Sequence, residues 1–111
     1  MNALKVILSA EAHRFVIELS ADVREKIDEN IRRVEKGIID RSLFKKLKGT
    51  EIWELRTQYE GMAYRILAFG DKRQRSLVIA THGFVKKTQK TPQKEIAKAE
   101  RIMQEYNNSK K

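Results

Sequence analysis

Two arginines and one histidine lie in strand-like segments of the chain, where their side chains could act on phosphate. Arg56, Arg65 and His82 each belong to an apolar run in which large apolar and polar residues alternate. Guanidinium groups bind phosphate oxygens in a forked geometry, and histidine gains or loses a proton near neutral pH. Arginine is rare in the middle of a strand unless it has a partner or a ligand. The set could therefore form a site that binds and cleaves a phosphodiester.

RNA suits such a site because its own ribose 2′-hydroxyl can attack the adjacent phosphate. This reaction needs a base for the hydroxyl proton, cations for the charge that builds on the phosphorane, and an acid for the leaving 5′-oxygen. Arg56 and Arg65 could supply the cations, and His82 or a lysine whose pKa is lowered by neighbouring cations could move the protons. Phe84, just past the expected strand, could stack on a base. No metal is required.

The same residues also have structural explanations. A histidine in a strand can be a hydrogen-bonded structural residue, and Phe84 can pack in the core. Glu54 shares the alternating face with Arg56 and could simply pair with one of the arginines. The lysine-rich segments 45–48 and 86–90 could be no more than solvated loops. Residue types and spacing leave each of these choices open.

Positive charge is concentrated in the middle of the chain. Residues 41–94 hold 13 Lys/Arg and 4 Asp/Glu, a net charge of +9 that equals the formal net charge of the whole chain. A basic segment of this kind is typical of a protein that binds a polyanion, and nucleic acid is the commonest such partner. The charge distribution therefore favours a nucleic-acid partner, with a merely solvated surface as the alternative.

Composition and length restrict the class of protein. With 111 residues, of which 41% are hydrophobic and 35% charged, the chain fits one soluble domain covering residues 1–111. No apolar run approaches the roughly 20 residues of a membrane span, and the N-terminus lacks the features of a signal peptide. Cysteine is absent, and the two histidines are far apart in sequence. We therefore expect a cytoplasmic protein with no metal site, no cofactor and no membrane contact.

Local patterns predict an α+β fold, in which a small antiparallel-rich sheet carries an N-terminal helical hairpin and a C-terminal helix. Ser9 and Ser20 can cap the two N-terminal helices, and Thr91 before Pro92 can start the last one. The expected elements are a strand at 3–8, a helix at 9–19, a helix from 20 to a stop at Gly37, strands at 52–59, 62–69 and 76–82, and a helix from 92 onward.

These strands would bring the candidate site residues to one face of the sheet. Alternation along each strand places Arg56, Arg65 and His82 on that face, provided that the pairing register is the one assumed. A slip of one residue would turn a whole strand over. The opposite face, which the helices are expected to cover, consists of Trp53, Leu55, Tyr64, Ile66, Leu77 and Ile79.

Three segments within residues 44–102 resemble a known protein family. They read "FKKLKGTEIWELR", "YRILAF" and "HGFVKKTQKTPQKEIAKAERI". They resemble the phage-derived, HigB-like branch of the RelE/ParE toxin superfamily. Its members pair a lysine-glycine-x-x-x-W-E-L-R strand with a strand ending in H-x-F-x-K-K-x-Q-K-T-P and a closing helix. The order of elements in that family, a strand, two helices, three strands and a helix, agrees with the order expected here.

The resemblance implies a toxin of a type II toxin–antitoxin system that cuts mRNA on the ribosome without a metal or a cofactor. The implied partners are mRNA, the ribosome and a cognate antitoxin, which is usually a small helix-turn-helix DNA-binding protein. The resemblance carries over Arg56, Arg65, Lys46, Lys48, His82, Lys86 and Lys87 as site residues. Together with the residue types, this leads us to expect catalysis by Arg56, Arg65, His82 and Lys87, and RNA binding by Lys45, Lys46, Lys48, Phe84, Lys86 and Lys90.

The chain departs from the resemblance in one respect. Toxins of this superfamily often use a tyrosine near the C-terminus, but the first tyrosine after the last expected strand is Tyr106, well inside the final helix. His82 or a lysine would have to replace it. Two other functions stay open: a ParE-like gyrase poison that does not cleave RNA, and a non-catalytic RNA-binding module.

Overall fold

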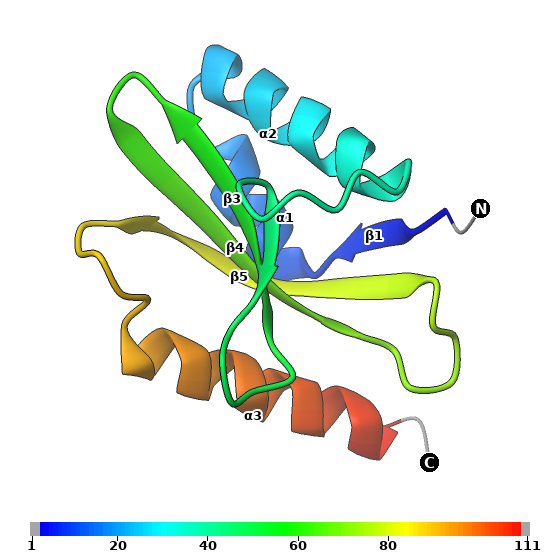
Figure 1. Ribbon diagram of the computed structural model, residues 1–111. Coiled ribbons are helices and arrows are strands. Elements are labelled where there is room, and N and C mark those ends of the chain that lie inside the picture. The colour runs from blue at the N-terminus through cyan, green and yellow to red at the C-terminus, as the bar shows by residue number, and fades with distance from the viewer. Residues whose placement is uncertain (1–2, 110–111) are drawn as a thin grey trace.

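A five-stranded sheet forms the centre of the molecule in the computed structural model, which describes residues 3–109 (Figure 1). The strands lie in the order β1-β5-β4-β3-β2. Helices α1 and α2 cover one face of the sheet, and α3 crosses the other face (Figure 1). In chain order the elements are β1 (Lys5–Leu8), α1 (Ala10–Ile17), α2 (Ala21–Glu35), β2 (Phe44–Lys46), β3 (Trp53–Tyr59), β4 (Met62–Gly70), β5 (Leu77–Lys86) and α3 (Gln93–Ser109).

The sheet is mixed, which corrects the expectation of an antiparallel-rich sheet. β1 pairs with β5 in parallel, whereas β2, β3, β4 and β5 pair with their neighbours in antiparallel fashion. A parallel pair needs a long crossover, and the residues between β1 and β5 supply one. Hairpin turns have local sequence signals, whereas nothing in the sequence around β1 shows that it pairs with β5.

The helix starts follow the local signals in the sequence. Ser9 accepts a hydrogen bond from the backbone N–H of Ala12 at 3.1 Å, so it caps α1 as expected. Ser20 caps α2 in the same way. Gly37, just beyond the end of α2, has a φ of 92°, which glycine adopts without strain. α3 begins at Gln93, so Pro92 precedes the first helical residue.

Two segments near the expected site differ from the sequence prediction. β5 runs to Lys86 and does not end at His82, so Phe84 lies inside the strand and not past it. β2 was not expected, because it is short and its lysines resemble a loop. Gly83 lies inside β5 and not in a turn. A side chain at this position would clash with α1, because a Cβ there would lie 2.2–2.7 Å from ring atoms of Phe15. This close approach of helix and strand, and not a chain reversal, requires the glycine.

A β-bulge in β5 changes which side chains share a face. Leu67 pairs with His82, but the next residue, Ala68, pairs with Ala80, so Thr81 is an extra residue in β5. Alternation is therefore inverted at Thr81. The expectation that Leu77 and Ile79 lie opposite His82 is wrong, because both pack with the α3 cluster on the face that carries His82.

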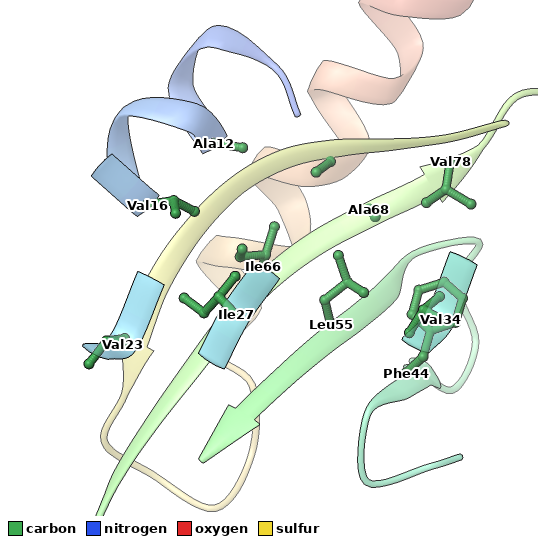
Figure 2. Close-up of a cluster of buried hydrophobic side chains, with 11 residues drawn as sticks. Ala12, Val16, Val23, Ile27, Val34, Phe44, Leu55, Ile66, Ala68 and Val78 are labelled. Carbon is green, nitrogen blue, oxygen red and sulfur yellow. The ribbon is translucent and has the colours of Figure 1, made fainter. Parts of the chain in front are cut away.

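Two buried clusters hold the helices to the sheet. The cluster under α1 and α2 combines residues of both helices with residues of the sheet (Figure 2). The cluster under α3 is smaller and joins β4 and β5 to the helix. The first consists of Ala12, Val16, Val23, Ile27, Val34, Phe44, Leu55, Ile66, Ala68, Val78 and Ala80, and the second of Ile52, Leu67, Phe69, Ile79 and Ala99.

Candidate nucleic-acid interface

Charged side chains gather on the α3 face of the sheet, next to the start of the helix. Arg56 in β3 pairs with Arg65 in β4, and Arg65 pairs with Phe84 in β5. Side chains directly opposite each other in a sheet have Cβ atoms about 5 Å apart, so this row crosses three strands at contact distance. Glu54 and Lys86 lie on the same face, each two positions from a member of the row.

Glu54 is the centre of this group. The residue is 1% exposed, and its Oε1 lies 3.5 Å from Nε of Arg56 and 3.4 Å from Nε of Arg65. Its other carboxylate oxygen accepts a hydrogen bond from the hydroxyl of Thr91. A buried carboxylate is costly unless it is paired and hydrogen-bonded, and here it is both. Glu54 therefore fixes both arginines and the loop that leads into α3.

Arg65 is buried but incompletely hydrogen-bonded. Its side chain is 8% exposed, and its Nη1 donates to the carbonyl of Tyr64 at 3.0 Å. Nε is fully buried and has no hydrogen-bond acceptor among the described residues, because the contact with Glu54 has the distance of an ion pair without hydrogen-bond geometry. Burial lowers the pKa of Arg65, and Arg56 adds to this effect, while Glu54 opposes it. A buried cation with a free donor is stabilised by an anion.

Arg56 is more accessible than Arg65. Its side chain is 26% exposed, and Nη1 donates to the backbone carbonyl of Arg41 at 3.0 Å. The remaining donors of the guanidinium group are therefore open to a phosphate that approaches from solvent. Together the two arginines offer one fixed and one reachable cation on the same face.

Two lysines complete a positive surface around Glu54. Lys45 in β2 pairs with Glu54, which places it on the same face. Lys86 is half-buried, and burial lowers its pKa; Glu54 opposes this shift, while Arg65, Arg56 and Lys45 add to it. We call the four cations Lys45, Arg56, Arg65 and Lys86, with Glu54 at their centre, the cationic cluster.

The structure does not bring the other predicted lysines into this cluster. Lys46 pairs with Trp53, which faces the α1 and α2 side of the sheet. Lys48 is exposed between β2 and β3. Lys87 and Lys90 are exposed in the loop between β5 and α3. Lys87 and Lys90 lie just beyond Lys86 along the chain, whereas Lys46 lines a pocket with Asp71 and Lys48 lines one with Met103 of α3, away from the cluster.

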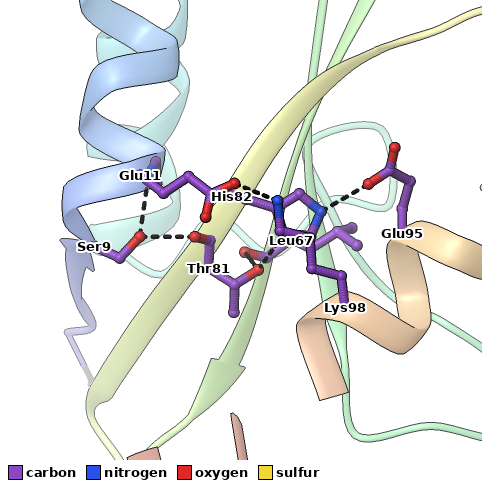
Figure 3. A network of polar contacts seen from close by, with 8 residues as sticks. Ser9, Glu11, Leu67, Thr81, His82, Glu95 and Lys98 are labelled. Carbon is purple, nitrogen blue, oxygen red and sulfur yellow. Dashed lines mark hydrogen bonds and ion pairs between the residues drawn. The ribbon is translucent and has the colours of Figure 1, made fainter. Parts of the chain in front are cut away.

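His82 lies beneath the first turn of α3, closed off from solvent. Its side chain is 3% exposed; Nε2 is 2.9 Å from Oε1 of Glu95 in α3, and Nδ1 is 2.9 Å from the hydroxyl of Thr81 (Figure 3). Its ring centre is 6.1 Å from that of Phe84. This geometry supports a role in positioning α3, and proton transfer by His82 stays a prediction.

Comparison with known proteins places the chain in a family. Residues 14–104 match the family described as phage derived protein Gp49-like (DUF891). The chain belongs to this Gp49-like family. The matched segment contains the whole cationic cluster. Comparison with curated proteins finds none that matches.

Two solved structures share the fold of this Gp49-like protein. A mutant of the Escherichia coli toxin RelE in the free state has a TM-score of 0.65 at 17% identity, covering 90% of this chain and 97% of that one. The toxin–antitoxin complex RelBE2 from Mycobacterium tuberculosis contains a chain with a TM-score of 0.59 at 16% identity, covering 76% of this chain and 99% of that one. At these identities the likeness shows a RelE-like fold.

Tyr106 of the Gp49-like protein lies at the other end of α3. Its hydroxyl donates to the carboxylate of Asp71, and this bond, with burial, raises the pKa of Tyr106. Asp71 directly follows β4, six residues beyond Arg65. At about 3.3 Å per strand residue, the two positions are roughly 20 Å apart along the strand. Tyr106 therefore attaches α3 to the end of β4 through Asp71 and is not part of the cationic cluster.

Sequence reasoning about the Gp49-like protein missed the extent of the network around Glu54. Alternation suggested that Glu54 pairs with one arginine, but it contacts both. No sequence pattern predicts the hydrogen bond from Thr91 to Glu54, because it forms only when the loop before α3 folds back across the sheet. Glu95 was also missed, although its place in the first turn of α3 is a common one for a carboxylate.

We expect the His82–Glu95 contact in the Gp49-like protein to stabilise α3 measurably. In a double-mutant cycle of His82→Ala and Glu95→Ala, urea unfolding should give a coupling free energy of about 1 kcal/mol, because the bond is largely buried. The exposed pair Lys98–Glu11, which also joins α3 to the rest of the fold, is the matched control and should give less. Additive effects of His82→Ala and Glu95→Ala would contradict a positioning role.

Within residues 3–109 of the Gp49-like protein, no three His, Asp or Glu side chains gather as metal ligands. No helix in this range is both long and apolar enough to cross a bilayer. These two findings describe the folded residues alone.

Proposed function

We propose that this Gp49-like protein is the toxin of a type II toxin–antitoxin pair and cleaves mRNA on the ribosome. The observation that carries the proposal is the cationic cluster, in which a buried arginine lies beside an accessible one and both contact the carboxylate of Glu54. The two solved structures with the same fold are a toxin and a toxin–antitoxin complex, which supports the same assignment. Within that class, the motifs in residues 44–102 favour the HigB-like branch.

The cluster suits phosphodiester cleavage by internal attack. A phosphate held by Arg56 and Arg65 would receive two guanidinium groups already fixed by Glu54, so charge that builds on the phosphorane is stabilised without rearrangement. In this proposal Phe84, which pairs with Arg65 and also packs against the cluster under α3, would contact the nucleotide that follows or precedes the scissile phosphate. Lys45 within the cluster and Lys87 and Lys90 beyond it would attract the RNA chain.

The proposed partners follow from this function. The ribosome would present the mRNA, and the reaction would take place in the cytoplasm. A cognate antitoxin, of the helix-turn-helix DNA-binding kind, would neutralise the toxin. An antitoxin partner is supported by the RelBE2 complex, in which a chain of the same fold is bound to its antitoxin.

One observation favours a second candidate, a non-catalytic RNA-binding module. Glu54 already occupies the inner side of both arginines, and His82 is closed off beneath α3. A surface of this kind could bind phosphate without the proton transfer that cleavage needs. It would show RNA binding with steep salt dependence and leave the RNA intact.

Induced expression in bacteria with mapping of mRNA 5′ ends tests the proposal. We expect growth arrest within minutes of induction and new 5′ ends inside translated codons. Blocking translation initiation beforehand should remove those cuts, because the substrate is ribosome-bound mRNA. Arrest with intact mRNA and a DNA-damage response would instead indicate a gyrase poison. RNA that copurifies uncut with a protein that causes no arrest would indicate the binding module.

A further inference from the structure

We propose that Lys86 is the general base of the reaction and accepts the proton of the attacking ribose 2′-hydroxyl. This inference rests on the proposed nuclease function and adds a role to a residue that the sequence placed among the RNA contacts. It departs from the expectation that His82 or Lys87 moves the proton.

Most other proton-transfer candidates in the described chain are poorly placed. His82 is closed off by Glu95 and Thr81, and Tyr106 is bonded to Asp71 at the far end of α3. Lys87 follows the last residue of β5, and a side chain there would alternate away from the cluster. Arginine does not lose its proton in proteins. These positions leave the amines of Lys45 and Lys86 and the carboxylate of Glu54. Lys45 lies in β2, two strands away from Arg65, whereas Lys86 lies in β5, the strand that pairs with the strand of Arg65.

Glu54 is less suited than Lys86 to act on a substrate. Its side chain is 2% exposed, one carboxylate oxygen faces both arginines, and the other accepts a hydrogen bond from Thr91. To reach a ribose hydroxyl, it would have to give up contacts that hold Arg56 and Arg65 in place. Its geometry is that of a residue that positions the cations.

Lys86 is placed where the substrate would lie. The strand register pairs Arg65 with Phe84 and Ala63 with Lys86, so Lys86 is the next residue on the same face of β5 after Phe84. It is half-buried at the end of the strand, with its amine able to reach solvent. A nucleotide whose phosphate binds Arg65 would have its ribose within reach of this side chain.

The surroundings of Lys86 favour an amine that can accept a proton. Burial lowers the pKa of Lys86, and the charges of Arg65, Arg56 and Lys45 lower it further, while the carboxylate of Glu54 acts in the opposite direction. A larger fraction of the amine is therefore neutral at physiological pH than for an exposed lysine. The arginines proposed to bind the phosphate thus also lower the pKa of the proposed base.

The step balances without a further reactant. The neutral amine takes the 2′-hydroxyl proton while the bond from the 2′-oxygen to phosphorus forms and the bond from phosphorus to the 5′-oxygen breaks. The 5′-oxygen takes a proton from water, and the hydroxide so formed takes the proton from the ammonium of Lys86. The products are a 2′,3′-cyclic phosphate and a 5′-hydroxyl end, with no net uptake or release of protons.

The variant Lys86→Arg separates charge from proton transfer. Single-turnover cleavage of a defined mRNA on purified ribosomes should be at least about 100-fold slower than for wild type, whereas binding to ribosomes that carry that mRNA should change little. Wild-type kcat/KM should rise with pH toward a plateau, and this rise should be absent in Lys86→Arg. Lys36→Arg, at the exposed C-cap of α2, is the matched control and should behave as wild type.

Rescue with a small amine gives a second readout. Ethylamine added to Lys86→Ala should restore cleavage with a rate that increases with amine concentration, while it should leave Lys86→Arg unchanged. Thermal unfolding of each variant shows whether the fold is intact.

The outcomes distinguish this inference from the function on which it rests. If wild type leaves ribosome-bound mRNA uncut, the nuclease proposal fails and the role of Lys86 falls with it. If wild type cuts and Lys86→Arg cuts at the same rate with the same pH dependence, the inference alone is overturned. Loss of binding equal to the loss of cleavage would also overturn it, because Lys86 would then be a phosphate contact.

Discussion

Replacing Arg65 with alanine should abolish growth arrest and reduce mRNA cleavage by about 10²- to 10³-fold, the loss typical for removal of one fixed donor to a developing oxyanion. Arg65 is held by Glu54 and by the carbonyl of Tyr64, and its buried Nε still lacks an acceptor. A phosphate would therefore meet a guanidinium group that is already oriented. The measurement is single-turnover cleavage on ribosomes, with 5′-end mapping in cells as its counterpart.

Two further variants distinguish a loss of catalysis from a loss of folding. Arg65→Lys preserves the charge but not the fork, so it should bind ribosomes carrying mRNA almost as well as wild type and cut far more slowly. Arg33→Ala removes an arginine whose side chain is 50% exposed on α2 and should cut normally. Full activity of a folded Arg65→Ala protein would show that the cationic cluster is not the place where RNA is cut.

Replacing Glu54 with alanine should give the largest loss of stability in the site. The side chain is 2% exposed and pairs with Arg65, whose side chain is 8% exposed, so the change leaves a buried charge without its partner. Breaking a buried pair from one side costs about 3–5 kcal/mol. We expect a loss toward the lower end of that range, because Arg56 is partly solvated. Urea denaturation followed by circular dichroism measures it.

A double variant tests the cause of this loss. In Glu54→Ala with Arg65→Ala, both members of the buried pair are removed, so the combined destabilisation should be clearly less than the sum of the two single losses. Thr91→Val, which removes only the hydroxyl bonded to Glu54, should cost about 1 kcal/mol. If Glu54→Ala proved as stable as wild type, Glu54 would not be the centre that holds the arginines.

The parts of the site that depend on a local hairpin could be predicted from the sequence. Glu60 and Gly61 close the turn between β3 and β4, with φ values of 47° and 80°. Such a two-residue turn sets the register of its two strands, so counting back from Tyr59 and Met62 pairs Arg56 with Arg65. This is why their shared face was expected correctly.

The parts that depend on contacts distant in sequence could not be predicted. Thr81 forms a bulge because Ala80 and His82 pair with consecutive residues of β4. No residue type in this segment predicts that pairing. The burial of His82 likewise depends on where α3 packs against the sheet after the loop. His82 was expected at the end of a strand, whereas it lies within β5 and contacts Glu95 of α3; its part in proton transfer stays a prediction.

The bulge at Thr81 has a consequence for how such proteins can diverge. Before it, Leu77 and Ile79 support α3; after it, Phe84 and Lys86 face the cationic cluster. β5 thus has two halves that share a face, and an apolar exchange in the first half does not reorient the side chains of the second. Deleting Thr81 would join Ala80 to His82 while both keep their partners Ala68 and Leu67 in β4, so Lys86 would stay on the face of the cationic cluster. β5 can therefore lose this bulge without turning the site residues over, whereas a one-residue insertion between Phe84 and Lys86 that kept regular pairing would turn Lys86 to the other side of the sheet.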